Sequence, residues 1–153
     1  MRALELKIPP LAVALLIAVA MWGIFWVAPE FGFAFAGREW VAVIFSVLGG
    51  VISISGIVSF RVAGTTVNPV NPNAATSLVN SGIYRVTRNP MYLGVLFLLI
   101  SWAVYLANPL TLFGTVVFVL YMNRFQIAPE ERALAAMFGE GFTAYKKRVR
   151  RWL

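Results

Sequence analysis

Four long apolar runs fill most of this 153-residue chain and dictate what it can fold into. They are Ile8–Val27, Trp40–Phe60, Tyr92–Leu106 and Leu110–Tyr121. The first two are each long enough to cross a bilayer as a single helix, which takes about 20 residues. Hydrophobic residues make up 60% of the chain and charged residues 12%, a composition typical of a membrane-embedded unit. We therefore expect an all-α integral membrane protein with four transmembrane helices.

The fourth run ends in polar residues. It reaches spanning length only if the helix continues through Ile127, which places Asn123 and Arg124 inside it. A charged residue in a membrane helix indicates a functional site. Snorkelling of Arg124 to the interface explains the same pattern equally well.

Two prolines predict how the second half of the chain is arranged. Asn108-Pro109 leaves almost no loop between the last two runs, so we expect them to form a tight helical hairpin. Pro129 is expected to open a separate C-terminal helix, with Glu130 and Glu131 in its first turn where the helix dipole favours anions. That segment has an apolar stripe and five cations near its end, which predicts an amphipathic helix resting on lipid headgroups.

Charge predicts the orientation of the chain in the membrane. The net charge is +7, from 13 cations and six carboxylates. With four crossings, every cation except Arg38 falls on one side, so both termini and the loop over residues 61–80 are expected in the cytoplasm. The cations lie beside apolar runs, which indicates membrane lipids as partners and argues against nucleic acid. The absence of a cleavable leader and the small size favour a prokaryotic inner membrane.

The second run carries a stripe of small residues. Ser46, Gly49, Gly50, Ser53 and Gly56 recur at spacings of three and four, which predicts a face against which another helix packs closely.

Several chemistries are excluded by the residue types that the chain lacks. It has no Cys, no His and no Asp. Disulfides, a thiolate nucleophile, a His–Asp relay and a metal site built on Cys or His cannot be made from it. Any acid–base role must come from the six glutamates, from tyrosine or from a substrate.

The polar stretch from Ser81 to Gly94 reads Ser-Gly-Ile-Tyr-Arg-Val-Thr-Arg-Asn-Pro-Met-Tyr-Leu-Gly and leads directly into the third apolar run. Pro90 suits the first turn of a helix, and Asn89 is then its expected N-cap, with its side-chain oxygen accepting from a free backbone N–H. On local physics alone, these arginines and tyrosines would be an ordinary interfacial anchor.

The whole stretch resembles the Gly-x-Tyr…Arg-(His/Asn)-Pro-x-Tyr-x-Gly signature of the integral-membrane isoprenylcysteine carboxyl methyltransferases, which are related to the phospholipid methyltransferases. The resemblance runs from about Thr76 to Val149 and includes Glu-Glu-x-x-Leu-x-x-x-Phe-Gly at Glu130–Gly139 and Ala-Tyr-Lys-Lys-Arg-Val at Ala144–Val149. Many members carry His where this chain has Asn89, and Phe142 stands where Tyr is common.

The resemblance implies S-adenosylmethionine as methyl donor and a lipid-like or hydrophobic small molecule as acceptor. It implies these cofactor contacts: Thr76, Ser77, Leu78, Val79, Tyr84, Asn89, Pro90, Met91, Tyr92 and Glu130. The substrate-side arginine of the isoprenylcysteine enzymes falls at Gln126, with Arg124 as the nearest cation, and the chain's own catalytic residues stay open. We expect one domain over residues 1–153, with two spans in 1–60 and the cofactor-binding loop, hairpin and C-terminal helix in 61–153.

Two other classes of function fit the sequence. A small four-span transporter or channel subunit normally carries an ionisable group in mid-membrane, and the first three runs have none. A scaffold that kept the fold and lost catalysis has no distinguishing sequence feature.

Overall fold

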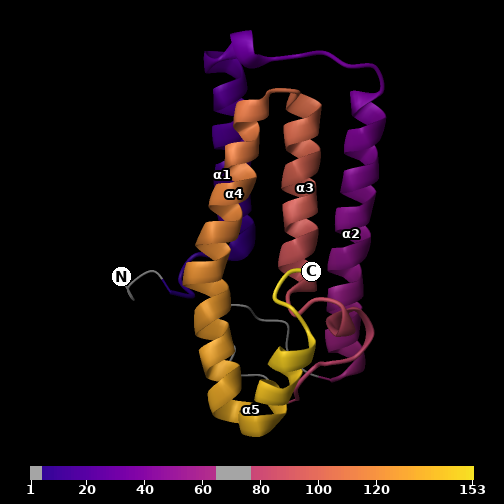
Figure 1. The fold of residues 1–153 in the computed structure, drawn as a ribbon, viewed down its shortest axis with the longest axis vertical. Helices are drawn as coiled ribbons and strands as arrows, with labels where there is room; N and C mark the ends of the chain where they lie inside the picture. The colour runs from indigo at the N-terminus through magenta and orange to yellow at the C-terminus, as the bar shows by residue number, and fades with distance from the viewer. Residues whose placement is uncertain (1–4, 65–76) are drawn as a thin grey trace.

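The computed structural model describes residues 5–64 and 77–153, and all of its regular elements are helical (Figure 1). The longer helices are α1 (Pro10–Val27), α2 (Arg38–Val62), α3 (Pro90–Leu106), α4 (Leu112–Tyr121) and α5 (Ala128–Arg148). Short helical segments lie between them at η2 (Pro29–Phe31), η4 (Gly82–Arg85), η5 (Pro109–Thr111) and η6 (Met122–Ile127). The all-α prediction is therefore confirmed for the described residues.

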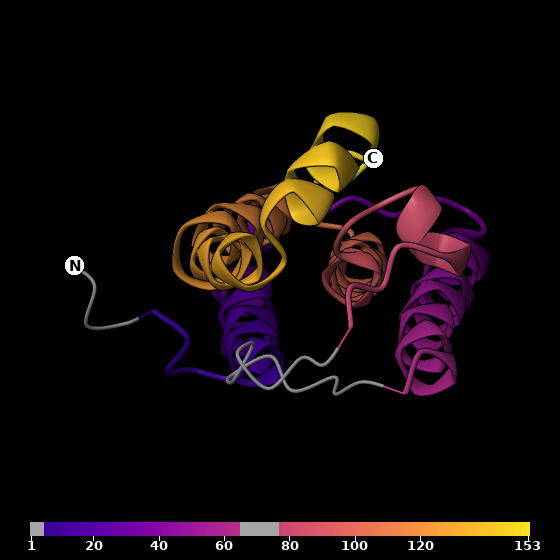
Figure 2. The same ribbon diagram turned by 90° about the horizontal axis from the view of Figure 1, so that it is seen from below.

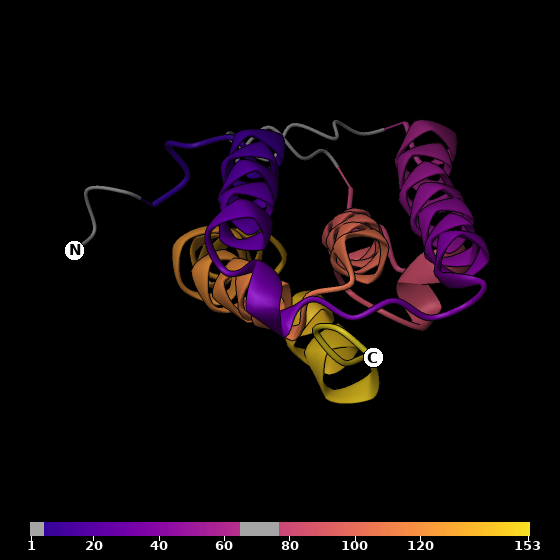
Figure 3. The same cartoon turned by 90° about the horizontal axis from the view of Figure 1, so that it is seen from above.

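Three of the helical stretches are long and apolar enough to cross a membrane. They are Pro10–Val27, Arg38–Val62 and the continuous helical stretch Pro109–Arg148. The predicted bounds of the first two apolar runs differ from α1 and α2 by two residues or fewer at each end. α3 has 17 residues and stands between α2 and α4 in the bundle (Figures 1 and 3). The chain is an integral membrane protein whose outward-facing helix surfaces are largely apolar.

α2 packs closely against α3 through the predicted stripe of small residues. A Cβ on Gly49 would lie 2.7 Å from the carbonyl oxygen of Gly94, so the two backbones approach too closely for side chains at these positions. Ser46 and Ser101 share a hydrogen bond of 2.8 Å across the same contact. Gly50 points elsewhere, with no atom within 4 Å of its Cβ position. The stripe is thus a packing face, as expected.

The predicted tight hairpin joins α3 to α4. Ala107 adopts a left-handed conformation with φ 48°, and Asn108 Oδ1 accepts from the backbone N–H of Leu110 at 3.1 Å. Asn108 Nδ2 donates to the carbonyl of Ala28 at 2.8 Å, which fixes the hairpin against the end of α1. Because Asn108 is 2% exposed, these bonds satisfy a polar side chain that has almost no contact with solvent.

The expected helix start at Pro129 is wrong. α4 continues into α5 through the π-helical segment η6, and Pro129 lies in the first turn of α5 without a break. A π-turn already interrupts the i→i−4 hydrogen bonds, so the missing N–H of Pro129 is accommodated there. The chain reverses instead at Gly139, with φ 50° and ψ −122° (Figure 1). Glu130 and Glu131 therefore do not lie at a free helix N-terminus.

The interior has two apolar clusters, one in the helix bundle and one below it. The bundle cluster includes Met21, Phe118 and Met122, each with 0% of its surface exposed. The second cluster gathers Tyr84, Phe142 and neighbouring side chains at the end where α2 stops and α3 starts. Figure 2 shows this end, with η4 beside α2 and the C-terminal part of α5 on one side of the bundle. The candidate site lies in this second cluster.

Candidate functional site

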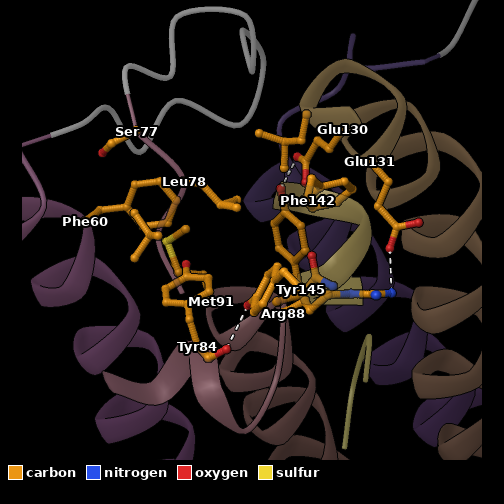
Figure 4. A pocket seen from close by; sticks show the side chains of 14 residues that line it. Phe60, Ser77, Leu78, Tyr84, Arg88, Met91, Glu130, Glu131, Phe142 and Tyr145 are labelled. Atoms are coloured by element: carbon orange, nitrogen blue, oxygen red, sulfur yellow. Dashed lines mark hydrogen bonds and ion pairs between the residues drawn. The ribbon is translucent and has the colours of Figure 1, made fainter. Parts of the chain in front are cut away.

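A cavity lies between the segment that leads into α3 and the facing side of α5 (Figure 4). Eight of the residues predicted to contact a cofactor line it: Ser77, Leu78, Val79, Tyr84, Asn89, Met91, Tyr92 and Glu130. Pro90 does not; it is buried at the start of α3, close to Gly56 of α2. Thr76 lies outside the described residues. The structure therefore brings most of these scattered positions to one place.

Glu130 is one of the two carboxylates that line the cavity. Its Oε1 accepts hydrogen bonds from Tyr92 Oη at 2.5 Å and from Gln126 Nε2 at 2.7 Å. Gln126 and Glu130 are four residues apart, so η6 and the first turn of α5 place both on one helix face. Both hydrogen bonds are accepted by the same oxygen, Oε1.

Arg88 and Glu131 form a second polar pair at the edge of the cavity. Arg88 Nη2 lies 2.8 Å from Glu131 Oε1, and each side chain is 11% exposed. Arg88 Nη1 donates to the carbonyl of Lys146 at 3.2 Å. Arg88 Nε is buried and has no hydrogen-bond partner in the described part of the chain. The Arg88 side chain lines the cavity, so its guanidinium is a candidate to contact a ligand bound there.

Asn89 occupies the N-cap position of α3, but the expected cap hydrogen bond is wrong. Its side chain makes no cap and instead donates from Nδ2 to the carbonyl of Arg151 at 2.8 Å. The Asn89 backbone N–H donates to Thr87 Oγ1 at 3.2 Å. The side-chain amide of Asn89 is used by Arg151, which lies 62 residues later in the sequence. The local sequence around Asn89 does not reveal such a distant partner.

The two substrate-side candidates lie in different surroundings. Gln126 is 2% exposed and contacts Glu130. Arg124 is 47% exposed and donates from Nη1 to Glu5 Oε1 at 2.8 Å. Arg132 pairs with the other oxygen of Glu5, and the hydrogen bond from Arg124 holds the pKa of Glu5 below its usual value. Arg124 thus forms its ion pair outside the cavity, whereas Gln126 donates to Glu130, which lines the cavity.

Aromatic side chains form the rest of the wall. Phe60 and Tyr84 meet edge to face with ring centroids 5.3 Å apart, and Tyr145 Oη donates to the carbonyl of Tyr84 at 2.7 Å. Burial raises the pKa of the Tyr84 phenol well above its usual value, so it stays protonated at neutral pH. Phe142 is 2% exposed and also lines the cavity. The rings give the cavity a face that attracts cations.

Sequence reasoning missed six lining residues: Phe60, Arg88, Glu131, Leu134, Phe142 and Tyr145. Arg88 and Glu131 belong to the quoted motifs, and each stands directly beside a predicted contact. The signal for these two was therefore present. Phe60 is the last residue of an apolar run, and nothing in its surroundings in the sequence distinguishes it from the lipid-facing residues before it.

Comparison with known proteins relates most of the chain to one family of enzymes. The family model described as phospholipid methyltransferase matches residues 38–141. An uncharacterized protein of Haemophilus influenzae is 46% identical over 63 residues, which cover 41% of this chain and all of that protein. The protein-S-isoprenylcysteine O-methyltransferase of Xenopus laevis is 35% identical over 114 residues, which cover 68% of this chain and 38% of that protein. The human protein of the same name is 36% identical over 90 residues, or 57% of this chain and 32% of that protein. No solved structure matches.

Proposed function

Because this chain belongs to the phospholipid methyltransferase family, we propose that it is an S-adenosylmethionine-dependent methyltransferase acting in the membrane. One observation carries the proposal. The Arg-Asn-Pro-Met-Tyr motif and the paired glutamates, about 40 residues apart in sequence, meet across a single cavity through Tyr92–Glu130 and Arg88–Glu131. A donor bound there would touch both motifs.

The residues of the cavity match the chemical groups of S-adenosylmethionine. A carboxylate of the donor would meet Arg88, whose buried Nε lacks a partner among the described residues. An amino group or the ribose hydroxyls would meet the carboxylate of Glu130. The sulfonium would lie among aromatic faces such as Tyr84 and Phe142, which attract cations. The donor supplies a methyl carbon that is already activated for displacement.

The chain's own task is then to bind, orient and exclude water. An in-line displacement gains most of its acceleration from positioning and desolvation. A carboxylate or thiolate acceptor needs no protein base, and an amine needs only to arrive neutral. The lack of His and Asp is compatible with this chemistry. We place Tyr92, Gln126 and Glu130 as binding and orienting groups.

The acceptor that fits best is a lipid-like or hydrophobic small molecule, of the isoprenylcysteine-carboxylate or phospholipid-amine type. α1 and α2 present exposed apolar side chains such as Leu15, Trp26 and Val47 to the surroundings. An amphiphile dissolved in the bilayer reaches such a protein without leaving lipid. The chain spans only about a third of the length of the animal relatives it matches.

For the membrane arrangement we propose four crossings within one domain over residues 1–153, with both termini in the cytoplasm of a prokaryotic inner membrane. The twelve-to-one distribution of cations supports the orientation. α3 has 17 residues, fewer than α1 or α2, and would cross as the partner of α4 in the hairpin. The C-terminal half of α5 carries Lys146, Lys147 and Arg148 and would lie along the headgroups.

Isothermal calorimetry of the purified protein with S-adenosylmethionine tests the proposal. We expect micromolar binding that Glu130→Ala and Tyr92→Ala each weaken by about tenfold, because each removes a polar contact at the donor site. Tyr105→Ala is the matched control, since Tyr105 lies on the same helix, half exposed and stacked on Trp102. No heat of binding, or full affinity in both site variants, would overturn the proposal.

A radiolabelled methyl-transfer assay against a fractionated lipid extract then identifies the acceptor. Transfer of label into one lipid fraction, abolished in Glu130→Ala, is the expected result. Donor binding without transfer to any fraction would indicate a scaffold that kept the fold and the donor site.

A further inference from the structure

The last residues of the chain form an ordered segment across the site. Val149–Trp152, which we call the C-terminal strap, follows α5 and runs beside the residues that lead into α3. Arg88 N donates to the carbonyl of Arg150 at 3.0 Å, and Thr87 pairs with Arg150 in a parallel bridge. Figure 1 shows the C-terminus lying beside the start of α3.

Arg151 in this strap contacts two opposite walls of the cavity. Its carbonyl accepts from Asn89 Nδ2 at 2.8 Å on the α3 side. Its guanidinium holds the carboxylate of Glu131 on α5 with Nε at 3.1 Å from Oε1 and Nη2 at 2.7 Å from Oε2. Such a bidentate ion pair fixes the orientation of the carboxylate as well as its distance, which a single point charge does not.

The strap is itself anchored to the helix bundle. Asn123 Oδ1 accepts from Arg151 Nη1 at 3.3 Å and from Trp152 Nε1 at 3.1 Å. Trp152 packs against the apolar cluster of the bundle. Arg151 does not line the cavity, so its contacts act on the walls and not on a bound molecule.

We propose that Arg151 is a positioning residue that sets the separation of Asn89 and Glu131, and through it the affinity for the methyl donor. The effect on donor affinity rests on the proposed function, whereas the effect on the separation of Asn89 and Glu131 does not. Asn89 and Glu131 each stand next to groups assigned to the donor, Met91 and Tyr92 on one side and Glu130 on the other. A wall that shifts by a fraction of an ångström moves these groups away from their partners.

Donor affinity is the first test. Arg151→Gln is expected to raise the Kd for S-adenosylmethionine by about tenfold, a coupling typical of residues in one ion-pair network. Arg151→Lys keeps the charge but loses the bidentate contact, so its Kd should lie between those of Arg151→Gln and the unsubstituted protein. The matched control is Arg148→Gln, because Arg148 is exposed and makes no ion pair with any described residue.

A double-substitution cycle separates positioning from general damage to the fold. Arg151→Gln removes one of the three ion pairs of Glu131, and Glu131→Gln removes all three, so the double variant should bind the donor no more weakly than Glu131→Gln alone. In steady-state assays the KM for the donor should rise while the KM for the acceptor is unchanged. Full additivity, or equal rises in both KM values, would overturn the proposal.

Spin-label distances test the positioning without any donor. The chain has no cysteine, so Val86→Cys and Ala136→Cys place labels at two exposed sites, one beside each wall, and nowhere else. The distance distribution should be narrow, become broader with Arg151→Gln and stay narrow with Arg148→Gln. An unchanged distribution with Arg151→Gln would refute positioning. If the unsubstituted protein bound no donor while these distances behaved as expected, the proposed function alone would fail.

Discussion

Glu130 and Glu131 are adjacent in the chain, yet their partners differ in kind. Glu130 receives hydrogen bonds from the neutral groups of Tyr92 and Gln126. Glu131 is surrounded by the cations Arg88, Lys146 and Arg151 within 3.6 Å. The charge of Glu131 is therefore neutralised inside the protein, whereas Glu130 has hydrogen bonds from neutral groups and forms no ion pair with any described residue. Glu131 joins three segments of the chain through its ion pairs, and under the proposed function Glu130 contacts the donor.

Arg88 permits a residue-scale prediction. Arg88→Lys keeps one positive charge but removes the buried Nε–H, which is the donor expected to meet a carboxylate of the ligand. The unsubstituted protein should therefore bind S-adenosylmethionine about tenfold more tightly than its decarboxylated analogue, and the variant should lose most of this preference. Competition binding with both compounds measures it.

The control for Arg88 is Arg85→Lys, an exposed arginine in the same segment. Its preference for the carboxylated donor should equal that of the unsubstituted protein. Equal binding of both compounds by the unsubstituted protein would show that Arg88 Nε meets something other than a carboxylate.

At the residue scale, the sequence indicates which residues lie in the site but not which partners position them. The motifs place Tyr92 and Glu130 in one site, because a family signature carries spatial information that local pattern lacks. The partners of Asn89 and Glu131 are different: Arg151 lies 62 and 20 residues away from them. Its role arises only when α5 reverses at Gly139 and returns the end of the chain to the start of α3.

At the scale of elements, α2 and α3 form the tightest helix contact, and it permits a stability prediction. Gly94→Ala places a Cβ 2.5 Å from the carbonyl oxygen of Gly49, and neither backbone can move without separating the helices. We expect the free energy of unfolding to fall by about 2 kcal/mol, as for other overpacked contacts. Thermal unfolding in detergent would show it as a lower Tm.

Gly50→Ala is the matched control on α2. Its Cβ would meet no atom within 4 Å, and alanine favours a helix over glycine. The Tm of this variant should stay the same or rise. A Gly94→Ala protein as stable as Gly50→Ala would mean that the two helices do not pack as the structure places them.

The helices themselves are predictable because apolar length fixes them, and the interruptions are not. Pro90 begins α3 as expected, since a helix start has no use for its missing N–H. Pro129 has the same chemistry, yet the helix passes through it, because η6 loosens the backbone just before. Whether a proline starts a helix or lies within one depends on the preceding turn, and the residues of η6 carry no sequence mark of a π-turn.

At the scale of the whole molecule, polar side chains gather at one end of an apolar bundle. At the end away from the site, Asn108 of the hairpin donates to the carbonyl of Ala28, and the loop from α1 to α2 crosses this end of the bundle (Figures 1 and 3). The site end holds Glu130, Glu131 and the C-terminal strap. In a bilayer this arrangement places the cavity near one surface, where a soluble donor and a lipid-dissolved acceptor can both arrive.

Orientation in the membrane is the prediction that belongs to the whole molecule. Single cysteines at Ser81, beside the cavity, and at Ala36, in the opposite loop, report the two ends without interference because the chain has none of its own. The excess of cations at the site end predicts that a membrane-impermeant thiol reagent labels Ser81→Cys only from the cytoplasm and Ala36→Cys only from the other side. Labelling in intact cells and in inverted vesicles distinguishes these outcomes. If Ser81→Cys reacted from outside, the cavity would face away from the cytoplasmic pool of S-adenosylmethionine, and the proposed donor could not reach Glu130 and Arg88.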